Sequence, residues 1–134
     1  MTIRRTDALR NATMTPLGTQ RGASAQIQVR SGPNAGVGGQ GTLLAQLTGN
    51  AAGWGTAVNG VLTSSAITSD QSADAAGTVG HYQINTQAGV FLESGLLDTA
   101  GTDGATIDNP SIVVGQVVQI SSPWINTEAY DDGI

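Results

Sequence analysis

The chain of 134 residues has no cysteine and no lysine, and it has a single histidine, His81. Without cysteine it forms no disulfide, no cysteine-ligated zinc site and no thiol nucleophile. Without lysine it has no Walker A motif, no Schiff base and no serine–lysine dyad, and one histidine excludes a multi-histidine metal site within one chain. Most enzyme classes lose their reagents in this way, so we expect a protein that is not an enzyme and that uses no cofactor and no metal.

Aromatic and charged residues are also scarce. Aromatic residues make up 4% and charged residues 11% of the chain, whereas glycine occurs 19 times. So little charge leaves too little repulsion and solvation to keep the chain unfolded, and the glycines follow no three-residue repeat of the collagen type. The length predicts one domain. Because few aromatic residues are available to fill its core, we expect the fold to be supported by oligomerisation or by a surface to which the protein binds.

Long apolar stretches are missing as well. No segment approaches the roughly 20 apolar residues that a membrane span requires. The first 19 residues contain Arg4, Arg5, Asp7 and Arg10, where a signal peptide would have a continuous apolar stretch. We therefore expect a protein that is made in the cytoplasm and has no membrane partner.

The charges that are present divide the chain into two parts. The first 30 residues hold all five arginines against one acid, a formal charge of +4, whereas residues 31–134 hold nine acids and no base. One interpretation is a short solvated N-terminus that happens to be rich in arginine. The other is an arm that docks through Arg4, Arg5 and Arg10 on an acidic neighbour, such as another copy of the chain. Nucleic acid is excluded as a partner, because an acidic body with five arginines lacks the basic face that backbone binding needs.

Helix signals are confined to the N-terminus. Residues 6–13 predict one or two turns of helix, because Thr6 is a good N-cap and Asp7 lies in the first turn. Pro16 and Gly18 are expected to stop this helix.

The rest of the chain has the pattern of strands. We expect strands over 25–30, 42–48, 60–69, 78–84, 90–97 and 111–121. Several of these segments alternate apolar and polar residues at period two, whereas 60–69 and 111–121 have apolar residues on both faces. In the first of these segments Ala25, Ile27 and Val29 share one face. The connection 85–89 contains glycine and predicts a hairpin. We expect 111–121 to be the strongest strand, with Gly115 marking a bulge or a close backbone approach.

This pattern predicts a mainly β fold, an antiparallel β-sandwich or small barrel with a short N-terminal helix or arm. We expect an N-terminal arm over 1–24, a β-domain over 25–122 and a C-terminal tail over 123–134. The tail combines Trp124, Ile125 and Tyr130 with three acids, which is more typical of an extended docking segment than of a strand. These side chains either pack on their own domain or anchor the protein to an adjacent subunit.

Three motifs invite a chemical interpretation that their context does not support. The run GVGGQG at 36–41 matches the dinucleotide fingerprint, but no βαβ context surrounds it, so we interpret it as a loop. His81 has no recognisable nucleophile motif to serve, so we expect it to be structural or exposed. The acids Asp98, Asp103 and Asp108 recur every five residues without the order of an EF-hand, so we expect Asx-turns.

Three stretches taken together resemble a known family. They are GTLLAQLT at 41–48, GVLTSSAITSDQSADAAGTVGHYQI at 60–84 and GTDGATIDNPSIVVGQVVQISS at 101–122. The chain resembles, over about residues 25–122, a family of small virion proteins of tailed bacteriophages, and the run SADAAGT is the most distinctive part. Members often carry a longer N-terminal helix than we expect here, and the aromatic, acidic tail lies outside the shared pattern.

The resemblance implies a structural virion protein, a capsid decoration or cement protein on the exterior of the head. Its partners would be the major capsid protein and further copies of itself, as a homo-oligomer such as a trimer. The family implies no catalytic residues. A tail-tube, neck or fibre-associated virion protein is the alternative. By this interpretation Arg4, Arg5, Arg10, Trp124, Ile125 and Tyr130 are the candidate partner-binding residues.

Overall fold

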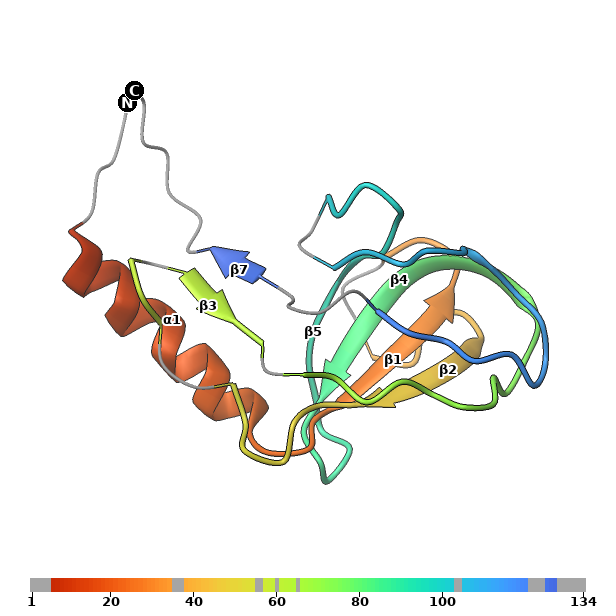
Figure 1. Ribbon diagram of the computed structural model, residues 1–134, viewed down its shortest axis with the longest axis horizontal. Coiled ribbons are helices and arrows are strands. Elements are labelled where there is room, and N and C mark those ends of the chain that lie inside the picture. The colour runs from red at the N-terminus through yellow and green to blue at the C-terminus, as the bar shows by residue number, and fades with distance from the viewer. Residues whose placement is uncertain are drawn as a thin grey trace.

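The computed structural model describes residues 6–34, 38–54, 57–59, 61–64, 66–102, 105–120 and 125–127. One helix and three short strands accompany four longer strands. In chain order they are α1 (Asp7–Arg21), β1 (Gln26–Ser31), β2 (Leu43–Thr48), β3 (Val61–Thr63), β4 (Gly77–Asn85), β5 (Phe91–Leu96), β6 (Ser111–Ile112) and β7 (Ile125–Thr127). Figure 1 shows α1, β3 and β7 at one end of the molecule and the main sheet at the other. The predicted mainly β fold with an N-terminal helix is confirmed.

The two ends of α1 follow ordinary capping rules. The Thr6 hydroxyl accepts a hydrogen bond from the Leu9 N–H at 3.2 Å, as the sequence predicts for an N-cap. After Arg21 the chain leaves the helix at Gly22, whose φ of 72° lies in the left-handed region that glycine adopts without strain.

The prediction that Pro16 and Gly18 stop this helix is wrong, because α1 continues to Arg21. Pro16 and Ala12 are both exposed, so water can hydrate the Ala12 carbonyl that lacks the proline's N–H. Gly18 is buried, and a Cβ at this position would lie 3.0 Å from the Trp54 Cβ. This glycine therefore allows close packing of the helix and does not end it.

The main sheet is antiparallel and has the strand order β2-β1-β4-β5, with β6 paired to the start of β4. β1 is central and pairs with both β2 and β4. The predicted hairpin joins β4 to β5, where the Thr86 N–H donates to the Val90 carbonyl at 2.9 Å. Gly89 in this turn has a φ of 90°. In this strand order, β2 and β5 lie at the two edges of the sheet.

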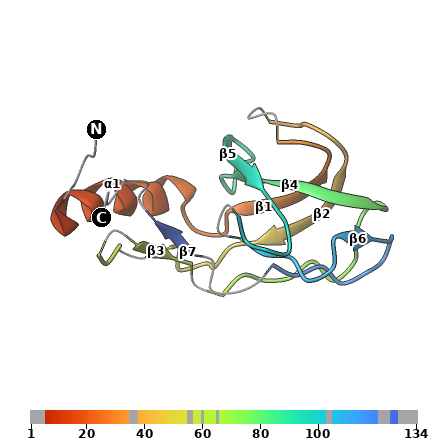
Figure 2. The same ribbon diagram turned by 90° about the horizontal axis from the view of Figure 1, so that it is seen from above.

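The second layer consists of extended segments rather than regular strands. Residues 66–76 and 105–120 run along one side of the sheet (Figure 2). An isolated bridge between Asp70 and Val118 joins the two segments, and a bridge between Ile107 and Ile120 joins two parts of 105–120. The first of these segments also covers the edge of β2, where the amides of Thr48 and Thr68 each donate to the other's carbonyl. The sheet is open, which is consistent with a small β-sandwich and does not support the barrel alternative.

The two faces of the main sheet differ in chemistry. Ile27 lies opposite Ile84 and Val29 opposite Tyr82, and all four are buried in the core between the layers. The alternate residues place Gln28 opposite Gln83 and Arg30 opposite His81 on the other face. The predicted alternation of β1 is therefore confirmed.

Two predicted strands are much shorter than expected. Among the described residues of 60–69, only Val61–Thr63 form a strand. Among those of 111–121, expected to be the strongest strand, only Ser111–Ile112 do. Gly115 has a φ of 83° and occupies a turn, so the chain turns where the run of apolar residues predicts continued extension.

Candidate docking surfaces

The N-terminal and C-terminal segments that the sequence proposes for docking come together at one end of the molecule. α1 packs against β3, and β3 pairs with β7 through Val61 opposite Thr127 and Thr63 opposite Ile125. We call α1, β3 and β7 the helix lobe. Its packing uses Met14 and Gly18 of the helix and Leu62 of β3, all buried.

The predicted partner-binding residues have different outcomes. Arg4, Arg5, Trp124 and Tyr130 lie outside the described residues. The side chain of Arg10 is 12% exposed and forms an ion pair with Asp7 one helical turn away, at 2.9 Å.

Ile125 begins β7, so the expectation that the tail does not form a strand is wrong for residues 125–127. There the backbone pairs with β3 of its own chain. The two paired strands, β3 and β7, are about 60 residues apart in the chain, so no local pattern in the sequence predicts that they pair.

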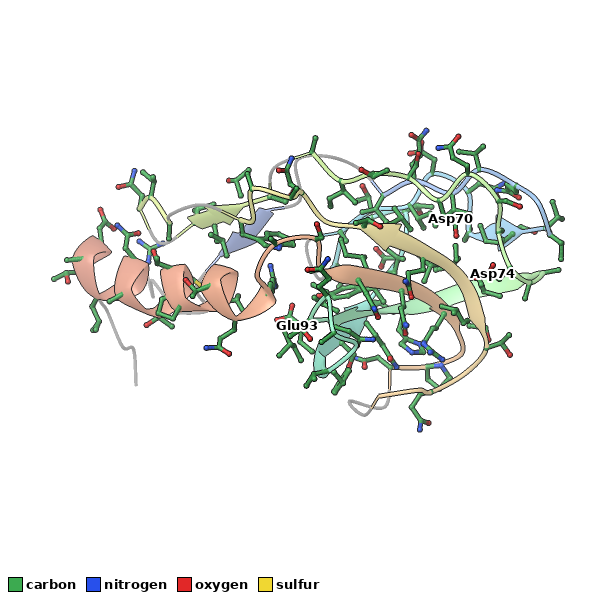
Figure 3. All side chains as sticks on the ribbon, turned by 90° about the horizontal axis from the view of Figure 1, so that it is seen from below. Asp70, Asp74 and Glu93 are labelled. Carbon is green, nitrogen blue, oxygen red and sulfur yellow. The ribbon has the colours of Figure 1, made fainter. Side chains whose placement is uncertain are left out.

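A buried arginine connects the helix lobe to the main sheet. The Arg21 side chain is fully buried, and its guanidinium donates to the Glu93 carboxylate on β5. The same guanidinium carbon lies 4.3 Å from the centre of the Trp54 ring, within the range of a cation–π contact. Glu93 is labelled in Figure 3, where it lies near the end of α1 that faces the sheet. The sequence count of five arginines does not reveal this internal role.

The polar face of the sheet is a layer of hydrogen-bonded side chains, which we call the polar layer and which consists of Gln28, Arg30, His81, Gln83 and Asn85. His81 is 1% exposed, and its Nδ1 lies 3.0 Å from the Gly32 carbonyl oxygen, so Nδ1–H donates and Nε2 is left as an acceptor. Gln83 Nε2 lies 3.5 Å from that acceptor. The imidazole thus has partners on both nitrogens, which fits the structural interpretation of this histidine.

The glycine-rich loop covers the polar layer. Within the described part of 36–41, the Gly39 N–H donates to Gln83 Oε1 at 3.1 Å, and Arg30 Nη1 donates to the Gln40 carbonyl at 3.3 Å. Residues 38–42 are followed by β2 and not by a helix. Residues 38–41 of the dinucleotide match therefore belong to a loop that hydrogen-bonds to the polar layer.

Asp98 forms the predicted turn. One carboxylate oxygen accepts from the N–H groups of Gly101 at 2.7 Å and Thr102 at 3.1 Å, and the other accepts from the Thr102 hydroxyl at 2.6 Å. The Thr102 hydroxyl hydrogen bond, followed by these backbone bonds, lowers the pKa of Asp98 below its ordinary value. Asp103 lies outside the described residues, and Asp108 is exposed.

The described residues offer little for metal or membrane chemistry. Among them no group of three or more histidine or acidic side chains is placed to hold a metal ion. None of the described helices is long and apolar enough to cross a membrane.

An open hollow of about 450 Å³ lies between the end of α1 and the β4–β5 turn. It is lined by Gln20, Arg21, Gly22, Ala23, Thr86, Gln87 and Ala88.

Exposed valines at the end opposite the helix lobe form a surface that the sequence did not predict. Val113, Val114 and Val117 are 58%, 67% and 51% exposed. We call residues 113–117 the valine turn. The adjacent valines on both sides of Gly115 predict a buried strand, and the contrary signal in the sequence is Gly115, which allows the turn.

Compared with protein-family models, with curated proteins and with solved structures, the chain has no match.

Proposed function

We propose that this chain is a structural virion protein of a tailed phage, most specifically a capsid decoration or cement protein on the exterior of the head. The resemblance of residues 25–122 to such proteins supports the proposal. The observation that carries it is the valine turn, which lies within the resembling stretch 101–122 and exposes three apolar side chains on a small domain. Apolar side chains grouped in this way are typical of surfaces that bind another protein.

The proposed partners are the major capsid protein and further copies of the chain, and no nucleic acid or membrane is required. Residues 31–134 carry nine acids and no base, which disfavours contact with the packaged genome and favours a position outside the shell. The activity is mass action: a protein that binds the assembled shell and not its separated subunits stabilises the shell. No catalytic step is proposed.

The test is to add the purified protein to empty shells assembled from the major capsid protein of the same genome. We expect saturable binding at many copies per shell, no binding to unassembled capsid subunits, and a higher temperature of shell disruption when the protein is bound. In intact particles, labelling with an antibody should mark the head. Labelling of the tail, neck or fibres at a few copies would instead support the alternative virion role.

A further inference from the structure

The valine turn is held rigidly by backbone hydrogen bonds. The Gln116 N–H donates to the Val113 carbonyl at 3.2 Å and closes a turn in which Gly115 has a φ of 83°. The segment before β4 braces it, because the Gly115 N–H donates to the Ala73 carbonyl at 3.0 Å and the Ala73 N–H donates to the Gln116 carbonyl at 2.8 Å. The turn therefore presents its side chains in one geometry, which lowers the entropic cost of binding.

The residue types in this turn are unusual for an exposed position. Turns are rich in glycine, proline, asparagine, aspartate and serine, whose backbones or side chains suit them. Here two β-branched apolar residues, Val113 and Val114, stand side by side, with Val117 close behind in the chain. Burying a valine side chain is worth about 1.5 kcal/mol or more. Leaving three of them in water therefore favours a partner that covers them.

A small cavity of about 90 Å³ adjoins the turn. Three buried core residues line this cavity, namely Ile107, Ile112 and Val118. Val117 and Asp108 line it as well. The polar residues Asn109, Gln116 and Gln119 complete the lining. The surface thus offers both projecting apolar side chains and a partly apolar hollow, which one apolar projection of a partner could enter.

Two exposed acidic residues, Asp74 and Asp108, lie close to this apolar surface. Asp108 lines the cavity, and the exposed Asp74 follows Ala73, which braces the turn. Figure 3 shows Asp70 and Asp74 in the part of the molecule away from α1. No arginine or lysine occurs anywhere in residues 31–134 to balance them. A complementary partner therefore has an apolar site flanked by basic side chains.

A second copy docked through the same surface fits poorly. Three partly exposed valines offer a few hundred Å², whereas a stable pairwise interface buries about 800 Å² on each partner. Two identical turns would also bring like-charged rims together. A contact this small is effective when it is one of several on an assembled array.

We propose that the valine turn is the anchor by which the protein binds the shell, inserting into an apolar site of the major capsid protein that is flanked by basic side chains. This inference rests on the proposed function and names the surface and the partner chemistry that carry it out.

The test measures binding of the full chain to the same empty shells by co-sedimentation. Val114→Ser should lower the apparent affinity about tenfold, and combined Val113→Ser, Val114→Ser and Val117→Ser should lower it by about a hundredfold or more. Val90→Ser is the matched control, because Val90 is 60% exposed in the β4–β5 connection, and it should bind within about twofold of the wild type. Asp108→Asn should weaken binding and make it less dependent on salt. All variants should keep the wild-type melting temperature.

Each outcome of the binding measurements supports or overturns the proposed anchor. If the wild type binds shells and the triple variant binds equally well, the valine turn is not the anchor, while the proposed function stands. If the wild type does not bind shells, the proposed function fails and this inference fails with it. If analytical ultracentrifugation shows a dimer that only the triple variant dissociates, the partner is a second copy and the shell assignment is overturned. Loss of binding in the Val90→Ser control as well would overturn the specific role of the turn.

Discussion

At the helix lobe, the arginines that the structure describes are engaged within the chain. Arg10 pairs with Asp7, and Arg21 is buried against Glu93 and Trp54. At the opposite end, backbone hydrogen bonds that join Gly115 and Gln116 to Ala73 brace the valine turn, and its side chains lie in solvent. Leu9 of α1 is exposed as well, but the valine turn has three exposed valines within five residues. The comparison shows that charged side chains make internal contacts at one end, whereas apolar side chains are left in solvent at the other.

The largest expected effect concerns the arginine that holds the helix lobe to the sheet. Arg21→Ala should lower the free energy of unfolding by about 3 kcal/mol, because it removes a buried charge partner and leaves Glu93 without its arginine. Chemical denaturation measures this. Asp7→Ala is the control and should change stability by about 0.5 kcal/mol, since the Asp7 side chain that pairs with Arg10 is 60% exposed. Equal effects of the two substitutions would contradict the difference in their roles.

Deletion of residues 123–134 should destabilise the isolated protein by about 2 kcal/mol, because β3 loses the backbone hydrogen bonds of β7. Thermal unfolding measures the change. A shorter deletion of residues 128–134 keeps β7 and removes only the residues after it, so it should retain most of the stability. If removing 123–134 leaves the melting temperature unchanged but abolishes shell binding, the tail is a docking segment after all.

A smaller effect on stability is expected from a substitution in the closely packed helix lobe. Gly18→Ala should cost about 1 kcal/mol, although alanine favours helix, because the added Cβ meets Trp54 and Leu62 at 3.0 and 3.3 Å. Pro16→Ala is the matched change two residues earlier on the exposed face, and it should increase stability because it restores a helical N–H. The melting temperatures of the two variants, measured by thermal unfolding, should therefore shift in opposite directions. A stabilising Gly18→Ala would mean that the helix is loosely packed.

The smallest prediction concerns pH and the turn at Asp98. Because the pKa of Asp98 in the folded protein lies below its ordinary value of 3.8, the ionised carboxylate stabilises the folded state above that pH. This contribution is lost as the pH falls through the folded pKa. Thr102→Val should raise the pKa of Asp98 toward its ordinary value by removing the hydroxyl donor. Side-chain carboxyl titration by NMR measures this, and an unchanged pKa in the variant would show that Thr102 is not the main cause.

Strand positions in the main sheet could be predicted from sequence because period-two alternation is a local signal. The segments 25–30, 42–48, 78–84 and 90–97 each fall within two residues of the observed β1, β2, β4 and β5. The alternation also separates the apolar from the polar face of β1 correctly. Helix length could not be predicted, because whether Pro16 faces solvent and Gly18 faces Trp54 depends on tertiary packing.

The candidate docking surface was less predictable than the fold. A run such as SIVVGQVV satisfies the pattern of a buried strand. The turn that exposes its valines is held by the local bond from the Gln116 N–H to the Val113 carbonyl and by the bonds to Ala73, which lies far away in the chain. The pairing of β7 with β3 and the burial of Arg21 depend on residues far apart in the chain. Such long-range contacts leave no periodicity in a single sequence.

A cryo-electron microscopy map of shells saturated with the protein tests the proposed docking most directly. We predict density for the protein on the outer surface of the head, with the valine turn against the shell and α1 directed away from it. Density in which α1 or β7 contacts the shell while the valine turn remains in solvent would contradict the assignment of the docking surface. Shells that carry no added density at saturating protein would contradict the proposed function itself.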